Sequence, residues 1–245
     1  MNKCKNCNET VNGNYCSNCG QTARLQRIDR KYVIREIASS VSAERGMLYT
    51  TWKMLISPGE SIKQYITEDR KRYVKPIPFL IASSLIYTLI SHFFHVDAKE
   101  FQQQLSIEAA PIELPTQDLI INWMQDYSGY SNIIIGLFFT FCVKLFFRKS
   151  NYNFFEIFVL FCYISGISSW FSSVIFVIQG LTHLDLIFFS SLMTMVYYTW
   201  ATGQFFGKKK ITNYIKTFVA YILGVSILTI FITIVVVFFD IILKQ

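Results

Sequence analysis

Four cysteines near the start of the chain have a spacing that is typical of metal ligands. They form two CxxC pairs, Cys4 with Cys7 and Cys16 with Cys19, separated by eight residues. Two such pairs can bring four thiolates around one tetrahedral Zn²⁺ ion. Four protein ligands leave no open coordination position, so the ion would be structural rather than catalytic. The sequence therefore predicts one Zn²⁺ bound by Cys4, Cys7, Cys16 and Cys19.

The gap between the two pairs has room for only one tight hairpin, and Asn12-Gly13 is a typical turn for it. Asn8 and Gly20, each directly after the second cysteine of a pair, tolerate the positive φ expected there. A disulfide pair or a redox CxxC are the alternatives, and a reducing cytosol disfavours both. Residues 1–21 are therefore predicted to form a zinc ribbon. A unit this small needs the bound zinc to fold, and it could also dock a partner.

Nucleic-acid binding is disfavoured for this ribbon. Its own residues offer only Lys3, Lys5 and a single aromatic side chain, Tyr15. Surfaces that bind nucleic acid instead combine many basic and stacking side chains. The expected partner of the ribbon is therefore another protein.

The composition of the whole chain indicates a membrane protein. Of its 245 residues, 52% are hydrophobic and 16% are charged, against about 25% charged in typical soluble proteins. The apolar residues are concentrated in five blocks long enough, or nearly so, to cross a bilayer. These blocks cover residues 76–95, 131–147, 154–178, 186–206 and 217–239. The predicted fold class is an all-α membrane protein, a five-helix transmembrane bundle (76–245) with a small N-terminal zinc ribbon.

Residues 22–75 are predicted to form a cytosolic connector of amphipathic helices. Helical periodicity covers residues 24–41 and again about 45–56. Ser57-Pro58-Gly59-Glu60 then reads as a helix start, with Ser57 as N-cap and Glu60 placed to close a capping box. The connector ends in a basic cluster that is expected to attract anionic lipid headgroups. Its members are Arg70, Lys71, Arg72 and Lys75.

Two runs of this sequence resemble a known family. One is Tyr15-Cys16-Ser17-Asn18-Cys19-Gly20-Gln21, and the other is Pro58-Gly59…Tyr65…Arg70-Lys71-Arg72-Tyr73…Pro76. Together they resemble an uncharacterised bacterial family of multispan membrane proteins, the 3667 domain-of-unknown-function family, over roughly residues 1–90. The resemblance implies a zinc ribbon joined to a membrane domain. It carries no known activity and therefore adds no catalytic residue.

The distribution of Lys and Arg predicts the orientation in the membrane, because these residues are retained on the cytosolic side. Of the 23 Lys and Arg residues, 21 either precede the first span or lie at the ends of later spans on that same side of the membrane. Only Lys99 and Lys244 are expected on the opposite side. The outer segment 96–130 instead carries six acidic residues. We expect a multi-pass protein of the bacterial cytoplasmic membrane with a cytosolic N-terminus and an external C-terminus.

A second candidate metal or acid–base group lies near the predicted outer face. Its members are His92, His95, Asp97, His183 and Asp185. They could meet to bind a divalent metal. The alternative is that histidines at span ends simply lie in the polar interface, and no motif such as HExxH supports the first interpretation.

Hydroxyl side chains form stripes within the spans, for example Ser84 with Thr88 and Ser165 with Ser169. Such stripes are typical of close helix packing, or of a polar pathway. No charged residue lies near the middle of a span, which disfavours coupled transport. The leading hypothesis is a non-enzymatic membrane protein whose ribbon docks a partner or folds back on the membrane domain. The alternatives are a passive or auxiliary transport component and a membrane enzyme with the outer His/Asp site.

Overall fold

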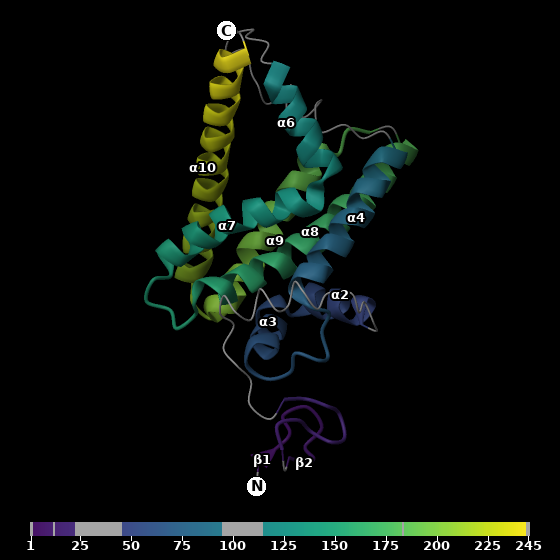
Figure 1. Cartoon of the computed structure of the whole chain (residues 1–245), viewed down its shortest axis with the longest axis vertical. Coiled ribbons are helices and arrows are strands. Elements are labelled where there is room, and N and C mark those ends of the chain that lie inside the picture. Colours follow the sequence, from purple (N-terminus) through teal and green to yellow (C-terminus); the bar gives the residue numbers. More distant parts are fainter. Residues whose placement is uncertain (1, 12, 23–45, 95–114, 183, 244–245) are drawn as a thin grey trace.

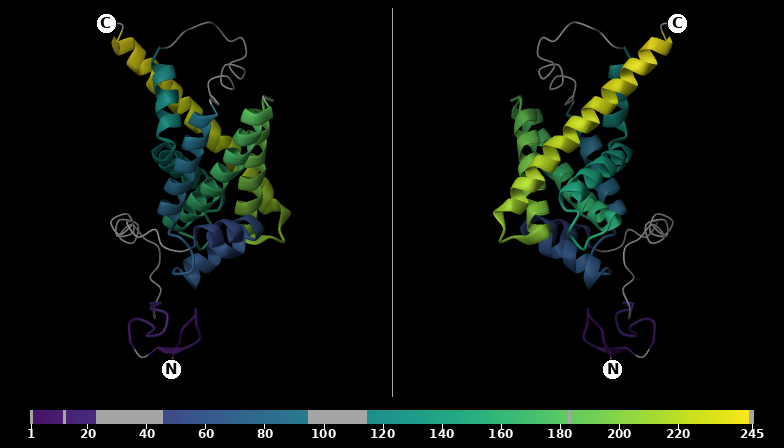
Figure 2. Two further views of the ribbon diagram at one scale, coloured as in Figure 1. Left: turned by 90° about the vertical axis from the view of Figure 1, so that its right-hand side faces the viewer. Right: turned by 90° about the vertical axis from the view of Figure 1, so that its left-hand side faces the viewer.

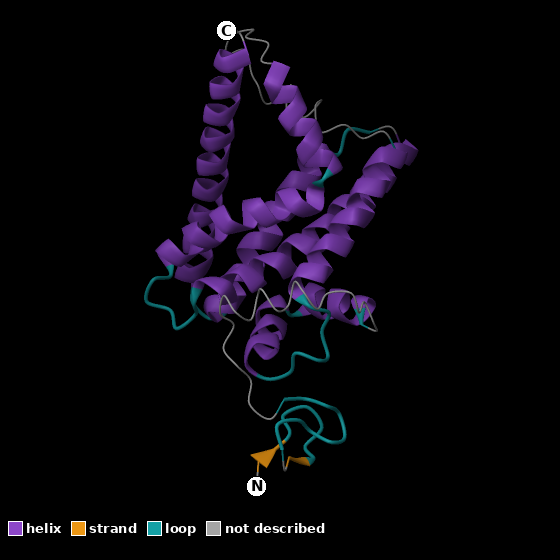
Figure 3. Ribbon diagram, in the orientation of Figure 1, coloured by secondary structure: helices purple, strands orange, loops and turns teal. Residues whose placement is uncertain are grey.

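A computed structural model describes residues 2–11, 13–22, 46–94, 115–182 and 184–243 (Figure 1). The helix predicted over residues 24–41 lies outside these ranges. Helices make up most of the described chain, and the strands are confined to its N-terminal end (Figure 3). The all-α prediction is confirmed.

The N-terminal unit is built on short backbone pairings rather than on a core. Strand β1 (Asn2–Lys3) pairs antiparallel with β2 (Thr10–Val11), and an isolated bridge joins Tyr15 to Thr22. This unit lies at one end of the molecule, and the C-terminal end of the last helix lies at the other (Figure 1). The two strands are too short to be stable without a further constraint.

Five long helices form the body of the molecule. They are α4 (Pro76–Phe93), α7 (Ser128–Phe146), α8 (Phe154–Thr182), α9 (Ile187–Gly207) and α10 (Ile211–Leu243). Four of these are long and apolar enough to cross a membrane: α4, α7, α8 and residues 211–239 of α10. The fifth, α9, is less apolar because it carries tyrosines, hydroxyl residues and Gln204. It nevertheless packs against both α8 and α10 within the bundle (Figure 1).

Helix α8 lies at the centre of the bundle and α10 at its edge. Residues Ile157, Leu160, Tyr163, Ile164 and Ile167 of α8 are fully buried. Helix α10 crosses the bundle diagonally, and its C-terminal part stands away from α8 and α9 (Figure 2). Its large apolar side chains are mostly exposed. Such a surface is typical of contact with lipid.

The connector helices lie across the end of the bundle nearest the ribbon (Figures 1 and 2). They are α2 (Met47–Ile56) and α3 (Pro58–Thr67). Ser57 is the N-cap of α3 and Pro58 its first residue, as predicted, but no side chain caps this helix. The Glu60 carboxylate instead accepts a hydrogen bond from the Lys208 ammonium at 2.6 Å. Lys208, at the end of α9, therefore gives the Glu60 carboxylate an ion pair in place of the backbone amide of the predicted capping box.

Helix α6 (Pro115–Asp126) leads almost directly into α7 at the end of the molecule opposite the ribbon (Figure 1). It contacts α7 and α10. Leu119, Trp123 and Tyr127 in and after this helix remain exposed. Aromatic side chains at this position suit a membrane interface.

A buried hydrogen bond between Tyr197 and Met54 holds α2 against α9. The Tyr197 hydroxyl donates to the Met54 carbonyl at 2.9 Å, and both residues are buried. We expect Tyr197→Phe to lower the free energy of unfolding by about 1–2 kcal/mol, because the carbonyl would be left buried without its donor. Thermal unfolding in detergent would measure this. Tyr130→Phe, at a side chain that is 64% exposed, is the control, and an equal loss in both variants would contradict the assignment.

Candidate metal centre

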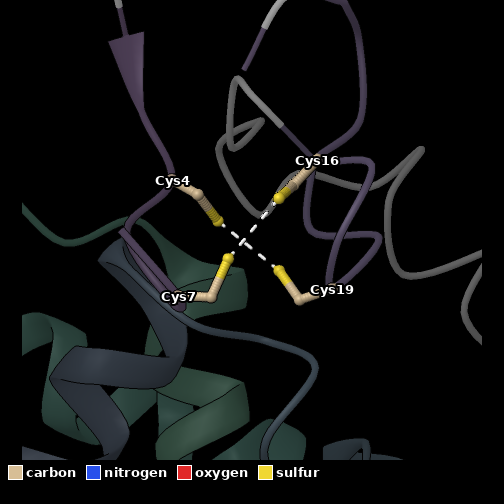
Figure 4. Close-up of side chains that lie close together, drawn as sticks. All are labelled: Cys4, Cys7, Cys16 and Cys19. Atoms are coloured by element: carbon tan, nitrogen blue, oxygen red, sulfur yellow. Dashed lines mark hydrogen bonds between the residues drawn. The ribbon is translucent and has the colours of Figure 1, made fainter. Parts of the chain in front are cut away.

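The four N-terminal cysteine sulfurs converge on one point (Figure 4). Their Sγ atoms all lie within 4.8 Å of one another. The Sγ atoms of Cys4 and Cys19 are 3.5 Å apart, and so are those of Cys7 and Cys16. Four sulfurs held about 2.3 Å from a central Zn²⁺ would be separated by about 3.8 Å. In the described part of the chain, no other group of three or more His, Cys, Asp or Glu residues comes close enough to share an ion.

The backbone around the two cysteine pairs is nearly the same. The amide of Asn8 donates to the Cys4 carbonyl at 2.9 Å, and that of Gly20 donates to the Cys16 carbonyl at 2.7 Å. Asn8 has φ 61° and Gly20 has φ 66°. The positive φ predicted for both residues is confirmed. Asn12, the first residue of the predicted turn, lies outside the described residues.

Backbone amides favour the thiolate form of Cys4 and Cys16, which is the form that binds a cation. The amides of Cys7 and Asn6 lower the pKa of Cys4 to about 7, and the amide of Cys19 lowers the pKa of Cys16. The Glu9 amide acts on Cys7 in the same direction, but burial and the neighbouring thiols raise the pKa of Cys7 to about 12. Four thiolates this close repel one another, and a bound divalent cation would remove that repulsion.

The ribbon rests on residues 67–71, which follow α3. The buried side chain of Gln21 donates to the Glu68 carbonyl at 2.9 Å. The Lys71 ammonium donates to the Cys19 carbonyl at 3.2 Å. A Cβ atom at Gly20 would collide with that ammonium. These contacts fix one face of the ribbon to the connector.

The basic cluster makes several contacts within the protein. Lys71 contacts the ribbon, the Arg70 guanidinium donates to the Ile66 carbonyl at 3.2 Å, and Arg72 lies 4.8 Å from the centre of the Tyr49 ring. The cluster therefore helps to position the ribbon and connector, a role that its charge pattern does not reveal. Its predicted contact with lipid headgroups stays a prediction.

Of the outer His/Asp group, the structure describes His92 and Asp185, whereas His95, Asp97 and His183 lie outside the described residues. His92 lies 3.1 Å from Asp126. Asp185 accepts a hydrogen bond from the Ile187 amide at 3.2 Å, where α9 begins. Among the described residues, His92 and Asp185 join no group of three possible metal ligands.

The hydroxyl stripes divide into two kinds. On α4, Ser84 and Thr88 pack against α7: Ser128 Oγ lies 2.6 Å from Thr88 Oγ1, and Asn132 donates to Ser84 Oγ at 3.1 Å. This part of the pattern serves helix packing. On α8, Ser165 and its neighbours also border a cavity of about 460 Å³ inside the bundle. Sequence periodicity alone could not separate the two cases.

Comparison with curated proteins and with solved structures finds no match. One segment does match a family, and it covers α2, α3, the basic cluster and the first part of α4, while the ribbon lies outside it. Over residues 44–88 the chain is similar to the family described as Protein of unknown function (DUF3667), which confirms the family resemblance of this part of the sequence.

Proposed function

We propose that this protein is a multi-pass protein of the bacterial cytoplasmic membrane whose N-terminal ribbon binds one structural Zn²⁺ and docks a protein partner at the cytosolic surface. The observation that carries the proposal is the convergence of four cysteine sulfurs within 4.8 Å of one another. Cysteine thiolates are soft ligands that favour zinc in a tetrahedral site. A closed set of four favours a structural ion.

The orientation is supported by where the basic residues gather. Lys208, at the start of the α9–α10 connection, contacts Glu60 of α3. Lys216 of α10 lies 5.9 Å from the ring of Phe147, which follows α7. These contacts bring separate basic segments to the ribbon end of the molecule, and such an end is retained in the cytosol. In this proposal α9 is the fifth crossing helix, and the C-terminus is external.

Partner docking is supported by the small contact between the ribbon and the rest of the chain. The described contacts involve one face, through Lys5, Gln21 and Lys71. Tyr15, between the two cysteine pairs, is 66% exposed. An exposed tyrosine on a rigid small module is a typical anchor for a protein interface.

Crosslinking in native membranes tests this proposal. A photoreactive amino acid at Tyr15 should give a discrete crosslinked product with another protein, and Cys16→Ser should abolish it. The same photoreactive residue at the similarly exposed Tyr130 is the control. Crosslinks from position 15 only to residues 67–71 of the same chain would contradict partner docking and leave the ribbon a purely structural unit.

Passive or auxiliary transport is a second candidate function, which the cavity of about 460 Å³ favours. A continuous path through the bundle is disfavoured because large side chains of the buried core border the cavity, namely Phe139, Phe161 and Tyr198. Purified protein in liposomes would measure the passage of small solutes, ions and lipids. Passage of none of them would contradict this candidate.

A further inference from the structure

The bundle contains a cavity bordered by α6, α7, α8, α9 and α10. It measures about 460 Å³, and its lining combines apolar side chains with uncharged polar ones, including serines of α7 and α8, Asn132, Thr194 and Tyr198. None of the lining residues, all of which the structure describes, is charged. Small-molecule sites typically measure about 300–1,000 Å³. The space is therefore large enough for an organic ligand that can exchange hydrogen bonds with hydroxyl groups.

A second, apolar pocket adjoins this cavity. It measures about 140 Å³ and lies between α6, α7 and α10. Apart from Ser131, its lining is apolar, with Trp123, Ile134 and Phe231 among the residues. The two spaces share several lining residues: Met124, Ser131, Ile135, Leu228 and Ile232. Together they form one site with a polar part and an apolar part.

Two buried hydroxyl groups beside the cavity are available for hydrogen bonds to a ligand. Ser131 is 4% exposed and Ser168 is 6% exposed. Both line the cavity, and neither hydroxyl has a hydrogen-bond partner among the described residues. Buried polar groups in proteins nearly always have a partner. Ser131 lines both the polar and the apolar part of the site. A group that recognises the junction between a headgroup and its tail would have this position.

We propose that this site binds one molecule of an uncharged lipid with a hydroxyl-bearing headgroup, such as a diacylglycerol. The hydroxyl groups of the ligand exchange hydrogen bonds with the serines in the cavity, and part of an acyl chain enters the apolar pocket between α6, α7 and α10. An anionic headgroup would be buried there without a cation, which is costly. The basic segments 70–75 and 208–210 lie at the end of the bundle that is nearest the ribbon (Figure 1).

Photolabelling of the purified full chain in detergent tests the proposal. A photoactivatable diacylglycerol should label α7 and α10 saturably. Unlabelled diacylglycerol should compete, whereas phosphatidic acid with the same acyl chains should not. The double variant Ser131→Ala/Ser168→Ala should bind roughly tenfold more weakly, since it loses two hydrogen bonds to the ligand.

The control variant is Ser83→Ala. Ser83 is also buried, and its hydroxyl also has no partner in the described ranges, but it does not line the cavity. Removing an unpartnered hydroxyl should leave the fold as stable as before in both variants. Equal labelling of the wild type and the double variant would overturn the proposal. So would equal competition by phosphatidic acid, competition by free glycerol as strong as that by the lipid, or labelling that does not saturate.

Discussion

Protein carrying Cys16→Ser should be purified without zinc and with an unfolded ribbon, while its membrane helices keep their stability. The ribbon has two-residue strands and no sizeable core, so the metal supplies most of its folding free energy. In zinc-finger peptides a structural Zn²⁺ contributes about 10–16 kcal/mol. Metal analysis should give one zinc ion per wild-type chain and none in the variant. Limited proteolysis should cut the variant within residues 2–22.

Cys142→Ala is the matched control for this change. Cys142 is a buried thiol of α7, outside the ribbon, and its replacement should leave the zinc content at one ion per chain. A chelator that removes zinc from the wild type should reproduce the protease sensitivity of Cys16→Ser. Unchanged zinc in Cys16→Ser would contradict the assignment of the site. A large fall in the melting temperature of the membrane helices would instead show that the folded ribbon contributes to their stability.

Replacing Gly59 by alanine should weaken the whole assembly of connector and bundle. A Cβ atom at this position would lie 2.7 Å from the backbone carbon of Gln204 and 2.7 Å from the backbone nitrogen of Phe205. Neither backbone atom can move aside without shifting α9. We expect a loss of about 1–3 kcal/mol in the free energy of unfolding, as for other overpacked sites. Thermal unfolding in detergent would measure it.

Gly129→Ala is the control for Gly59→Ala. A Cβ atom at Gly129 would meet Ser84 and Ile81 only at ordinary contact distances of 3.7 and 3.8 Å. Because alanine is a better helix former than glycine, this variant should be as stable as the wild type or slightly more stable. A Gly59→Ala variant with unchanged stability would show that α3 does not pack directly on the backbone of α9.

Local patterns in the sequence predicted those features that local chemistry determines. Paired cysteines with Asn8 and Gly20 predicted the geometry of the ribbon, and Pro58 and Pro76 mark the first residues of α3 and α4. Apolar blocks predicted the long helices. The polar residues of α9 make that helix fall short of the hydropathy of the other spans, because its tyrosine and threonine side chains face neighbouring helices and the cavity rather than lipid alone.

The contacts that hold the parts together could not be predicted in the same way. Gln21 with Glu68, Lys71 with Cys19 and Tyr197 with Met54 each join a side chain to a backbone carbonyl far away in the sequence. A carbonyl group is present at every residue, so no residue type marks the partner. The capping box predicted at Glu60 does not form for a related reason, because the Glu60 carboxylate pairs with Lys208 of a distant segment.

The attachment of α3 and α2 to α9 also sets an order of events during synthesis. Tyr197 follows its partner Met54 by 143 residues, and a ribosome adding about 5–20 residues per second needs about 7–30 s to make that stretch. Throughout this interval the Met54 carbonyl lacks the hydroxyl group that donates to it, and α3 lacks the helix α9 on which it packs. The connector can therefore reach its final packing only after α9, the second-last helix, has been made.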